Sequence, residues 1–284
     1  MAHGTSVALV TDSTACLAPK DAEREGITVV PLKVAIGDET FTEGCGLSGE
    51  TIAEALREKK PVTTSRPTPE EFVEVYEGLA KDGADEIVSV HLSSKLSGTL
   101  DAATVASKRA PVPVTVVDST TIGLALGFAA GRAARARDAG GVASSMAAAA
   151  RAAGEASTTL LYVDTLEYLR RGGRVTGLGA FIGSALAVKP ILTVRGGEVV
   201  PLDRVRTASK AMARLEALTV VACHAIDDGF DIGIQHLAAH EAAERFAERL
   251  AQALGRDHVP VDEISAVVGA HSGPGTISVS MTPR

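Results

Sequence analysis

Strand-like and helical segments alternate along the first half of the chain, and this alternation restricts the possible folds more than any other feature. The runs "SVALVTDST" (6–14) and "DEIVSVHL" (85–92) are short, apolar and rich in β-branched residues, as buried strands are. Each is followed by a stretch with helix-forming composition. Strands that alternate with helices form a mostly parallel sheet covered by helices. We therefore expect an α/β protein with a Rossmann-like N-terminal domain.

The second half of the chain is less regular and predicts a mixed sheet. Gly196 and Gly197 separate two β-like runs, which is a strong signal for a hairpin. The runs "ISAVVGA" (264–270) and "TISVSMT" (276–282) read as two further strands, joined by "HSGPG". We predict two domains: an N-terminal α/β domain over residues 1–156 and a mixed-sheet α/β domain over residues 157–284.

Charge and composition argue against two classes of partner. The 284 residues carry a net charge of −7, with 28 Lys and Arg against 35 Asp and Glu, and only 3% of them are aromatic. An acidic chain is repelled by nucleic acid and by anionic membranes, and few aromatic rings are present on which bases could stack. We expect no nucleic-acid partner.

The same reasoning predicts a cytoplasmic protein without metal or cofactor. The longest apolar stretch (122–136) is interrupted by Gly and Arg and is too short to span a bilayer, so we expect no stable membrane insertion. The start of the chain lacks the pattern of a signal peptide, and the three cysteines lack the spacing of a metal site or a disulfide framework. A phosphate-binding Gly-Lys-Ser/Thr loop is also missing.

Four loops combine glycine or small residues with hydrogen-bond donors, and we regard them as the candidate binding site. They are "TTSRP" (63–67), "SSKLSGT" (93–99), "RRGGR" (170–174) and "HSGPG" (271–275). In open α/β sheets, ligands collect at the carboxyl ends of the strands. Amide groups at a helix start, next to small hydroxyl side chains, favour an anion.

Each loop also has an ordinary structural explanation. Ser97 is well placed to cap a helix, and Thr64 and Ser65 precede a proline that shapes a turn. Arg174 follows a glycine pair, where it can bind the last carbonyls of a helix. His271 is the stronger functional candidate, because a Gly-Pro-Gly loop restrains the backbone beside it. The histidines at positions 91, 236 and 240 read as structural or solvated.

Taken together and in this order, the loops resemble those of the DegV family. The segments that carry the resemblance are "VTDSTACL", "VVPLKVAIGDETFTEG", "PVTTSRPTPEEF", "LSSKLSGT", "VVDSTT", "DTLEYLRRGGRV", "IGSALAVKPIL", "GGEVVPLDRVRT" and "AHSGPGTISV". They extend over nearly the whole chain.

The resemblance implies a lipid carrier rather than an enzyme. Such proteins bind one long-chain fatty acid, for example palmitate. They present its carboxylate to a partner fatty acid kinase and then carry the acyl phosphate. By resemblance, the carboxylate contacts are Thr64, Ser94 and His271, and no residue is catalytic. The supporting head-group residues are Ser65, Ser93, Ser97, Gly98, Thr99 and Gly273, and the arginines for head-group binding or kinase docking are Arg174 and Arg206.

Two positions depart from the family pattern, which usually has Gln where this chain has Arg66 and Asp where it has Cys16. Arg66 adds positive charge beside the head-group site, whereas Cys16 is expected to affect a local cap. We expect the acyl tail in an apolar channel that opens beside Ser94 and is lined by "FIGSALAVKPIL" (181–192).

Two other functions compete with the carrier. A serine-dependent esterase or acyltransferase would use Ser94 as nucleophile and His271 as base, with Asp12 or Asp118 orienting the imidazole. A binding module for a phosphorylated small molecule would use the helix-start loops alone.

Overall fold

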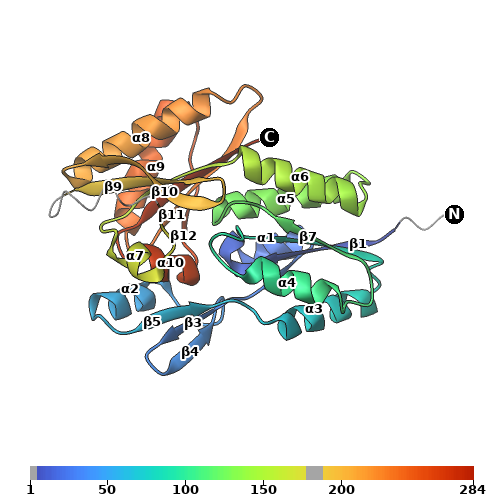
Figure 1. Cartoon of the computed structure of the whole chain (residues 1–284). Coiled ribbons are helices and arrows are strands. Elements are labelled where there is room, and N and C mark those ends of the chain that lie inside the picture. The colour runs from blue at the N-terminus through green and yellow to red at the C-terminus, as the bar shows by residue number, and fades with distance from the viewer. Residues whose placement is uncertain (1–4, 177–187) are drawn as a thin grey trace.

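The computed structural model describes residues 5–176 and 188–284, which form three sheets with helices packed around them (Figure 1). The first sheet has four parallel strands in the order β2–β1–β6–β7. Its strands are β1 (Val7–Asp12), β2 (Ile27–Val30), β6 (Glu86–His91) and β7 (Val114–Asp118). The predicted parallel N-terminal sheet is confirmed.

Helices cover both faces of this parallel sheet, as Figure 1 shows. Along β1 the side chains alternate between the faces: Leu9 packs with one pair of helices and Val10 with the other. Val10 belongs to a core with Phe72 and Tyr76, whereas Leu9 packs in a core with Met146. The pairs are α3 (Pro69–Lys81) with α4 (Thr99–Ser107), and α5 (Leu124–Asp138) with α6 (Ala143–Ala156).

The second sheet is mixed and has the strand order β10–β9–β8–β13–β11–β12. Only the β11–β12 pair is parallel in this sheet as described. Its strands are β8 (Thr158–Tyr162), β9 (Lys189–Arg195), β10 (Glu198–Val205), β11 (Phe230–His236), β12 (Val261–Glu263) and β13 (Ile277–Pro283). The expected hairpin is confirmed: β9 and β10 are antiparallel and joined at Gly196 and Gly197, both with positive φ.

One face of the mixed sheet packs on two long helices and the other face is turned toward the parallel sheet. Leu160 and Val279 point to α8 (Ala208–His224) and α9 (His240–Leu254). Leu161, the next residue on β8, belongs instead to the core that includes β1 and β6. This core crosses from one half of the chain to the other, and the predicted domain boundary after residue 156 stays a prediction.

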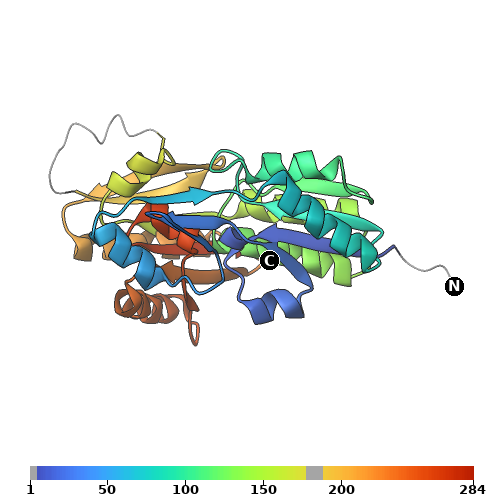
Figure 2. The same cartoon turned by 90° about the horizontal axis from the view of Figure 1, so that it is seen from below.

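A small antiparallel sheet, β4–β3–β5, was not anticipated as a separate layer. Its strands are β3 (Lys33–Ile36), β4 (Glu39–Thr42) and β5 (Val62–Ser65). Residues 63–65 therefore belong to a strand, where the sequence suggested a loop. The sheet packs with α2 (Gly49–Arg57) against α7 (Glu167–Gly172) and α10 (Ala266–Ser272). Figures 1 and 2 both show α2 (blue) beside α10 (red).

The prediction that "ISAVVGA" forms a strand is wrong, because this segment ends in helix α10. Ser265 caps the helix by accepting a hydrogen bond from the Val268 amide at 3.2 Å. Glu43 accepts another from the Val267 amide at 3.0 Å. A seven-residue apolar run does not reveal its period, and here distant Glu43 helps satisfy the helix start.

The remaining elements are two short helices. They are η1 (Ser13–Ala15) and α1 (Pro19–Arg24), which connect β1 to β2. Within residues 5–176 and 188–284, each helix falls short of the length or apolar character needed to cross a bilayer.

Candidate functional site

A cavity of about 360 Å³ lies where the loops of the parallel sheet, the mixed sheet and α10 meet. Its volume is in the range of small-molecule sites. Leucines, isoleucines and valines from both halves of the chain make up much of its wall, among them Leu32, Leu92, Leu96, Leu161, Val199 and Val267. Thr64 of β5, Arg174 just after α7 and His271 of α10 bring polar groups to one part of this wall, which we call the polar end.

Six of the residues singled out in the sequence line this cavity. They are Thr64, Ser65, Ser97, Gly98, Arg174 and His271. They come from four segments that are far apart in the chain, and the fold brings three of these together because α10 packs against both β5 and α7. Arg66 lines the cavity as well.

The centre of the polar end is a hydrogen-bonded pair, Thr64 and His271. The Thr64 Oγ1 atom lies 2.8 Å from Nε2 of His271. Thr64 is fixed by strand pairing with Val34, and His271 belongs to the last turn of α10. Burial and, to a smaller degree, the positive charge of Arg174 lower the pKa of His271 to about 4. The imidazole is therefore neutral at pH 7.

Thr64, Arg174 and His271 also line an outer cleft of about 490 Å³. The three residues thus stand between the inner cavity and the surface. The cleft is rich in basic side chains, namely Lys59, Lys60, Arg171 and Arg174. A group held by Thr64 and His271 would face these cations on its outer side.

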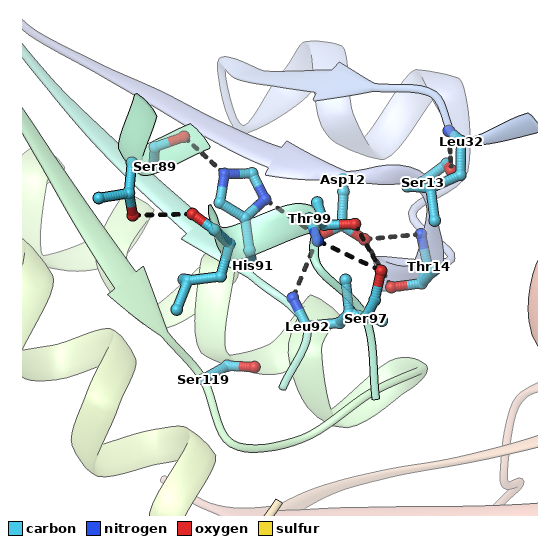
Figure 3. Close-up of polar contacts among 12 residues, drawn as sticks. Asp12, Ser13, Thr14, Leu32, Ser89, His91, Leu92, Ser97, Thr99 and Ser119 are labelled. Atoms are coloured by element: carbon cyan, nitrogen blue, oxygen red, sulfur yellow. Dashed lines mark hydrogen bonds and ion pairs between the residues drawn. The ribbon is translucent and has the colours of Figure 1, made fainter. Parts of the chain in front are cut away.

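The 93–99 loop is held in place by a buried polar network around Asp12 (Figure 3). The Asp12 carboxylate accepts hydrogen bonds from the amide of Leu92 and from Nδ1 of His91, both at 3.0 Å. The Ser89 hydroxyl contacts the other imidazole nitrogen of His91 at 2.7 Å. His91 lies outside the cavity lining, and its partners explain its place in a strand. The network orients the loop and leaves Ser97 and Gly98 beside the cavity.

The three serines of the 93–99 loop have different hydrogen-bond partners. Ser97 Oγ lies 2.9 Å from the hydroxyl of Thr99, which is buried at the start of α4. Ser93 is buried and donates to the Gly197 carbonyl at 2.7 Å, so it fastens the loop to the β9–β10 hairpin. Ser94 is exposed, lies outside the cavity lining and donates to Asp118 at 2.6 Å. A direct contact of Ser94 with a ligand would require this bond to break, and its binding role stays a prediction.

Gly273, Arg206 and Cys16, which the sequence analysis also named, are not on the cavity wall. Gly273 ends α10 with a positive φ and packs against Tyr168. Arg206 is exposed after the end of β10. Cys16 caps η1 in a left-handed conformation, and its Sγ contacts the Thr14 carbonyl. Burial raises the pKa of the Cys16 thiol to about 12.

The structure describes only part of the predicted tunnel segment, residues 181–192. Residues 181–187 lie outside the described residues. The described remainder, 188–192, consists of Val188 and the first residues of β9 and is absent from the cavity lining, while Val194 further along the strand is part of it.

The esterase arrangement is not assembled in the described part of the chain. Ser94 is bonded to Asp118 and His271 to Thr64, and Asp12 orients His91 instead of His271. A triad needs the nucleophile and the base within hydrogen-bond reach of each other.

Sequence reasoning missed the hydroxyls on the inner wall of the cavity. They belong to Thr159, Ser272, Ser278 and Ser280, and Gln235 lies with them. The alternating serines in "TISVSMT" were a usable signal, since residues i and i+2 share one face of a strand.

The fold and the site define an α/β binding protein with an apolar cavity that ends at a neutral imidazole and a hydroxyl. Comparison with known proteins is consistent with this class. The DegV family, described as uncharacterised proteins, matches residues 6–284. The chain belongs to the DegV family.

Its relatives extend over the whole chain. A DegV domain-containing protein of Streptomyces coelicolor is 50% identical over 284 residues, which cover 98% of this chain and 99% of the relative. A fatty-acid-binding DegV family protein from Thermus thermophilus has a TM-score of 0.89 at 30% identity, covering 99% of this chain and all of that one. DegV from Bacillus subtilis, described as a fatty acid binding protein, has a TM-score of 0.87 at 31% identity, with the same coverage.

Proposed function

We propose that this protein binds one long-chain fatty acid in the inner cavity and presents its carboxylate at the Thr64–His271 pair. The observation that carries the proposal is a largely apolar cavity that adjoins the outer cleft at Thr64, Arg174 and His271, where the hydroxyl of Thr64 and the imidazole of His271 are hydrogen-bonded to each other. The fatty-acid-binding relatives from Thermus thermophilus and Bacillus subtilis support the same ligand class.

The acyl tail supplies the affinity. At about 0.8 kcal/mol per buried methylene, fourteen methylenes give a gross gain of roughly 11 kcal/mol. This gain is comparable to the cost of association, which is about 4–15 kcal/mol. A short acid cannot offset this cost, so chain length should decide binding.

The head-group site supplies orientation. A carboxylate withdrawn from water needs donors, or it takes up a proton. In our proposal, the donors are the hydroxyl of Thr64 and Nε2–H of His271, with Ser97 and the Gly98 amide region on the other side and Ser94 as a further predicted contact. The exposed guanidinium groups of Arg66 and Arg174 line the same end and add positive charge.

We further propose a partner fatty acid kinase, which would phosphorylate the presented carboxylate so that the protein then carries the acyl phosphate. The basic outer cleft adjoins the presented group and suits an anionic product. Arg174 and Arg206 are exposed, as docking contacts must be. In this proposal, the protein acts as a carrier in the cytoplasm, and the fatty acid is its ligand without any further cofactor.

Native mass spectrometry of gently purified protein tests the binding proposal. We expect a mass increase that corresponds to a single fatty acid, recovered by organic extraction and identified against standards. Delipidated protein should bind hexadecanoic acid and ignore octanoic acid at the same concentration. Protein that is empty as purified and ignores added hexadecanoic and octadecenoic acids would contradict the proposal.

The kinase half is tested separately. Incubation of the loaded protein with a fatty acid kinase and ATP should give an acyl phosphate that is trapped by hydroxylamine. The Arg174→Ala/Arg206→Ala variant should still bind the acid but give the product more slowly. Equal rates of acyl phosphate formation for the variant and the wild-type protein would show that these arginines do not contribute to kinase docking.

A further inference from the structure

The cavity-facing side of the mixed sheet carries hydroxyl groups where an acyl tail calls for apolar side chains. Thr159 on β8 and Ser278 and Ser280 on β13 line the cavity, yet the three residues are only 6%, 5% and 2% exposed. Ser280 lies opposite Thr159 in the strand pairing, so the hydroxyls form one cluster. The other face of the same two strands is apolar and packs against α8 and α9. The hydroxyls are therefore concentrated on the ligand side.

This hydroxyl cluster (Thr159, Ser278 and Ser280) lies deep in the cavity. Tyr162 ends β8 and pairs with Ile277, which begins β13. Helix α7 follows β8 and helix α10 precedes β13 in the chain, so this end of the two strands is the one nearer the polar end of the cavity. Thr159 and Ser280 are three residues farther along the strands, or roughly 10 Å at the usual rise of a strand. An extended alkyl chain advances ~1.2 Å per bond, as an extended backbone does. The cluster should thus meet an acyl chain roughly eight to twelve carbons from its carboxyl group, a range that also allows for the offset of His271 from the strand ends.

The hydrogen-bonding capacity of this wall is not used up by the protein. Oγ1 of Thr159 and Oγ of Ser280 lie 3.0 Å apart, and this one contact leaves the pair with a further hydrogen to donate. The hydroxyl of Ser278 makes no hydrogen bond to the residues that the structure describes. The buried Oγ of Ser272, also on the cavity wall, has no partner within the same residues. A buried hydroxyl that faces only methylenes is less stable than one that is hydrogen-bonded.

We propose that the inner cavity binds an oxygen atom carried by the acyl chain, so that the preferred ligands are long-chain fatty acids with a hydroxyl group near mid-chain. This inference rests on the proposed function and specifies its ligand. A ligand hydroxyl can donate to one member of the cluster and accept from another, which satisfies groups that a plain chain leaves unpaired. In a wholly apolar tunnel the same ligand hydroxyl would be buried without a partner and would weaken binding.

The test compares two acids that differ by one oxygen atom. Delipidated protein is titrated with octadecanoic acid and with 10-hydroxyoctadecanoic acid, using displacement of a fluorescent fatty acid as the readout. We expect the wild-type protein to bind the hydroxy acid more tightly than the plain acid. The Ser278→Ala/Ser280→Ala variant should bind the hydroxy acid at least tenfold more weakly, with its affinity for octadecanoic acid unchanged or increased.

A buried hydroxyl away from the cavity provides the control. Thr219 in α8 is fully buried and donates to the Leu215 carbonyl, so Thr219→Val removes a hydroxyl without touching the cavity wall. This variant should bind both acids as the wild-type protein does. Thermal unfolding of each variant shows that it is folded, and the single variant Ser278→Ala replaces the double one if that is unstable.

The outcomes separate the two proposals. Binding of octadecanoic acid that is as tight as, or tighter than, binding of the hydroxy acid would overturn the inference and leave the proposed function intact. An equal loss for both acids in the serine variant would also overturn it. Failure of the wild-type protein to bind either acid would overturn the proposed function and the inference together.

Discussion

At the scale of single residues, His271 shows how burial prepares a binding group. The imidazole is enclosed by the cavity and by α7, and a Cβ atom on Gly172 would collide with its Nδ1 atom. Desolvation, with a smaller effect of Arg174, keeps its pKa at about 4. A neutral imidazole can exchange a hydrogen bond with Thr64 or donate to a carboxylate without a buried ion pair.

This lowered pKa makes protein stability depend on pH. An unfolded histidine has a pKa of about 6.5, so below that pH the unfolded chain binds a proton that folded His271 does not bind until the pH approaches 4. The stabilisation is therefore complete above pH 6.5 and is lost as the pH falls toward 4. Between pH 7 and pH 5 the loss should be on the order of 2 kcal/mol. In His271→Gln, urea unfolding at the two pH values should show a smaller decrease in the free energy of unfolding. The same decrease in both proteins would contradict this account.

Thr64 is the second residue whose hydroxyl should contribute to the affinity for the fatty acid. Thr64→Val keeps the shape of the side chain and removes the hydroxyl that lies 2.8 Å from His271. A charged acceptor that loses one donor should bind about 1–3 kcal/mol more weakly, which is roughly a 5- to 150-fold rise in Kd for hexadecanoic acid. Thr63→Val is the matched control, because Thr63 is exposed on the same strand and is not on the wall of the inner cavity. Equal affinities for the two variants would exclude Thr64 from the head-group site.

At the scale of secondary-structure elements, glycines set how closely α7 and α10 approach. Gly172 ends α7 against the ring of His271, and Gly273 ends α10 against the ring of Tyr168. Gly273 also has φ +83°, which side-chain-bearing residues rarely adopt. Because neither glycine has a side chain, the two helices can hold His271 at the rim of the cavity.

Two helical glycines in different surroundings test this packing. Gly78, within α3, would place an added Cβ in open space, so Gly78→Ala should stabilise the protein by about 0.5–1 kcal/mol. Gly172→Ala forces the imidazole aside and should destabilise it by about 1–3 kcal/mol. Fatty-acid binding should weaken only in Gly172→Ala. The free energy of unfolding of both variants is measured by urea unfolding. If Gly172→Ala also stabilised the protein, α7 would be able to move away from His271 without loss of stability, and this account of the packing would be wrong.

The elements also show where local sequence ceases to be informative. The β9–β10 hairpin was predictable because its glycine pair adopts the conformations that a tight turn needs. Helix α10 was not predictable, because one of the free amide groups at its start donates to Glu43, which lies more than 200 residues away in the chain. Likewise β5 reads as a loop until β3 pairs with it.

At the scale of the whole molecule, the cavity lies within cores shared by both halves of the chain. One core joins Leu9 and Val90 of the parallel sheet to Leu161 and Leu192 of the mixed sheet. Another joins Val34 of the small sheet to α10. A ligand in the cavity touches both halves and should stabilise them together.

Ligand binding should therefore raise the thermal stability of the whole chain. A ligand present at 100 times its Kd adds about 2.7 kcal/mol, which for a protein of this size corresponds to a Tm increase of roughly 4–5 °C. We expect a single unfolding transition by calorimetry that shifts with hexadecanoic acid and stays in place with octanoic acid. Two transitions, of which only one shifts, would show that the halves unfold independently.

The candidate site was predictable as a set of segments but not as a geometry. Thr64, Ser97 and His271 stood out because hydroxyls and an imidazole beside glycine and proline need a reason to be there. Ser94 stood out equally, yet its hydroxyl turns to Asp118. Two adjacent serines cannot be told apart by composition, since the direction of each depends on partners from other strands.

Strand and helix periods and turn residues are local properties, and they were enough to predict the α/β class and the parallel sheet and to reveal the resemblance to the DegV family. Which segments meet, that Thr64 bonds His271, and that hydroxyls line the depth of the cavity became clear from the three-dimensional fold alone. The reason is physical: hydrogen-bond partners, burial and the pKa of an imidazole depend on groups brought close in space, and their separation in the chain hides them.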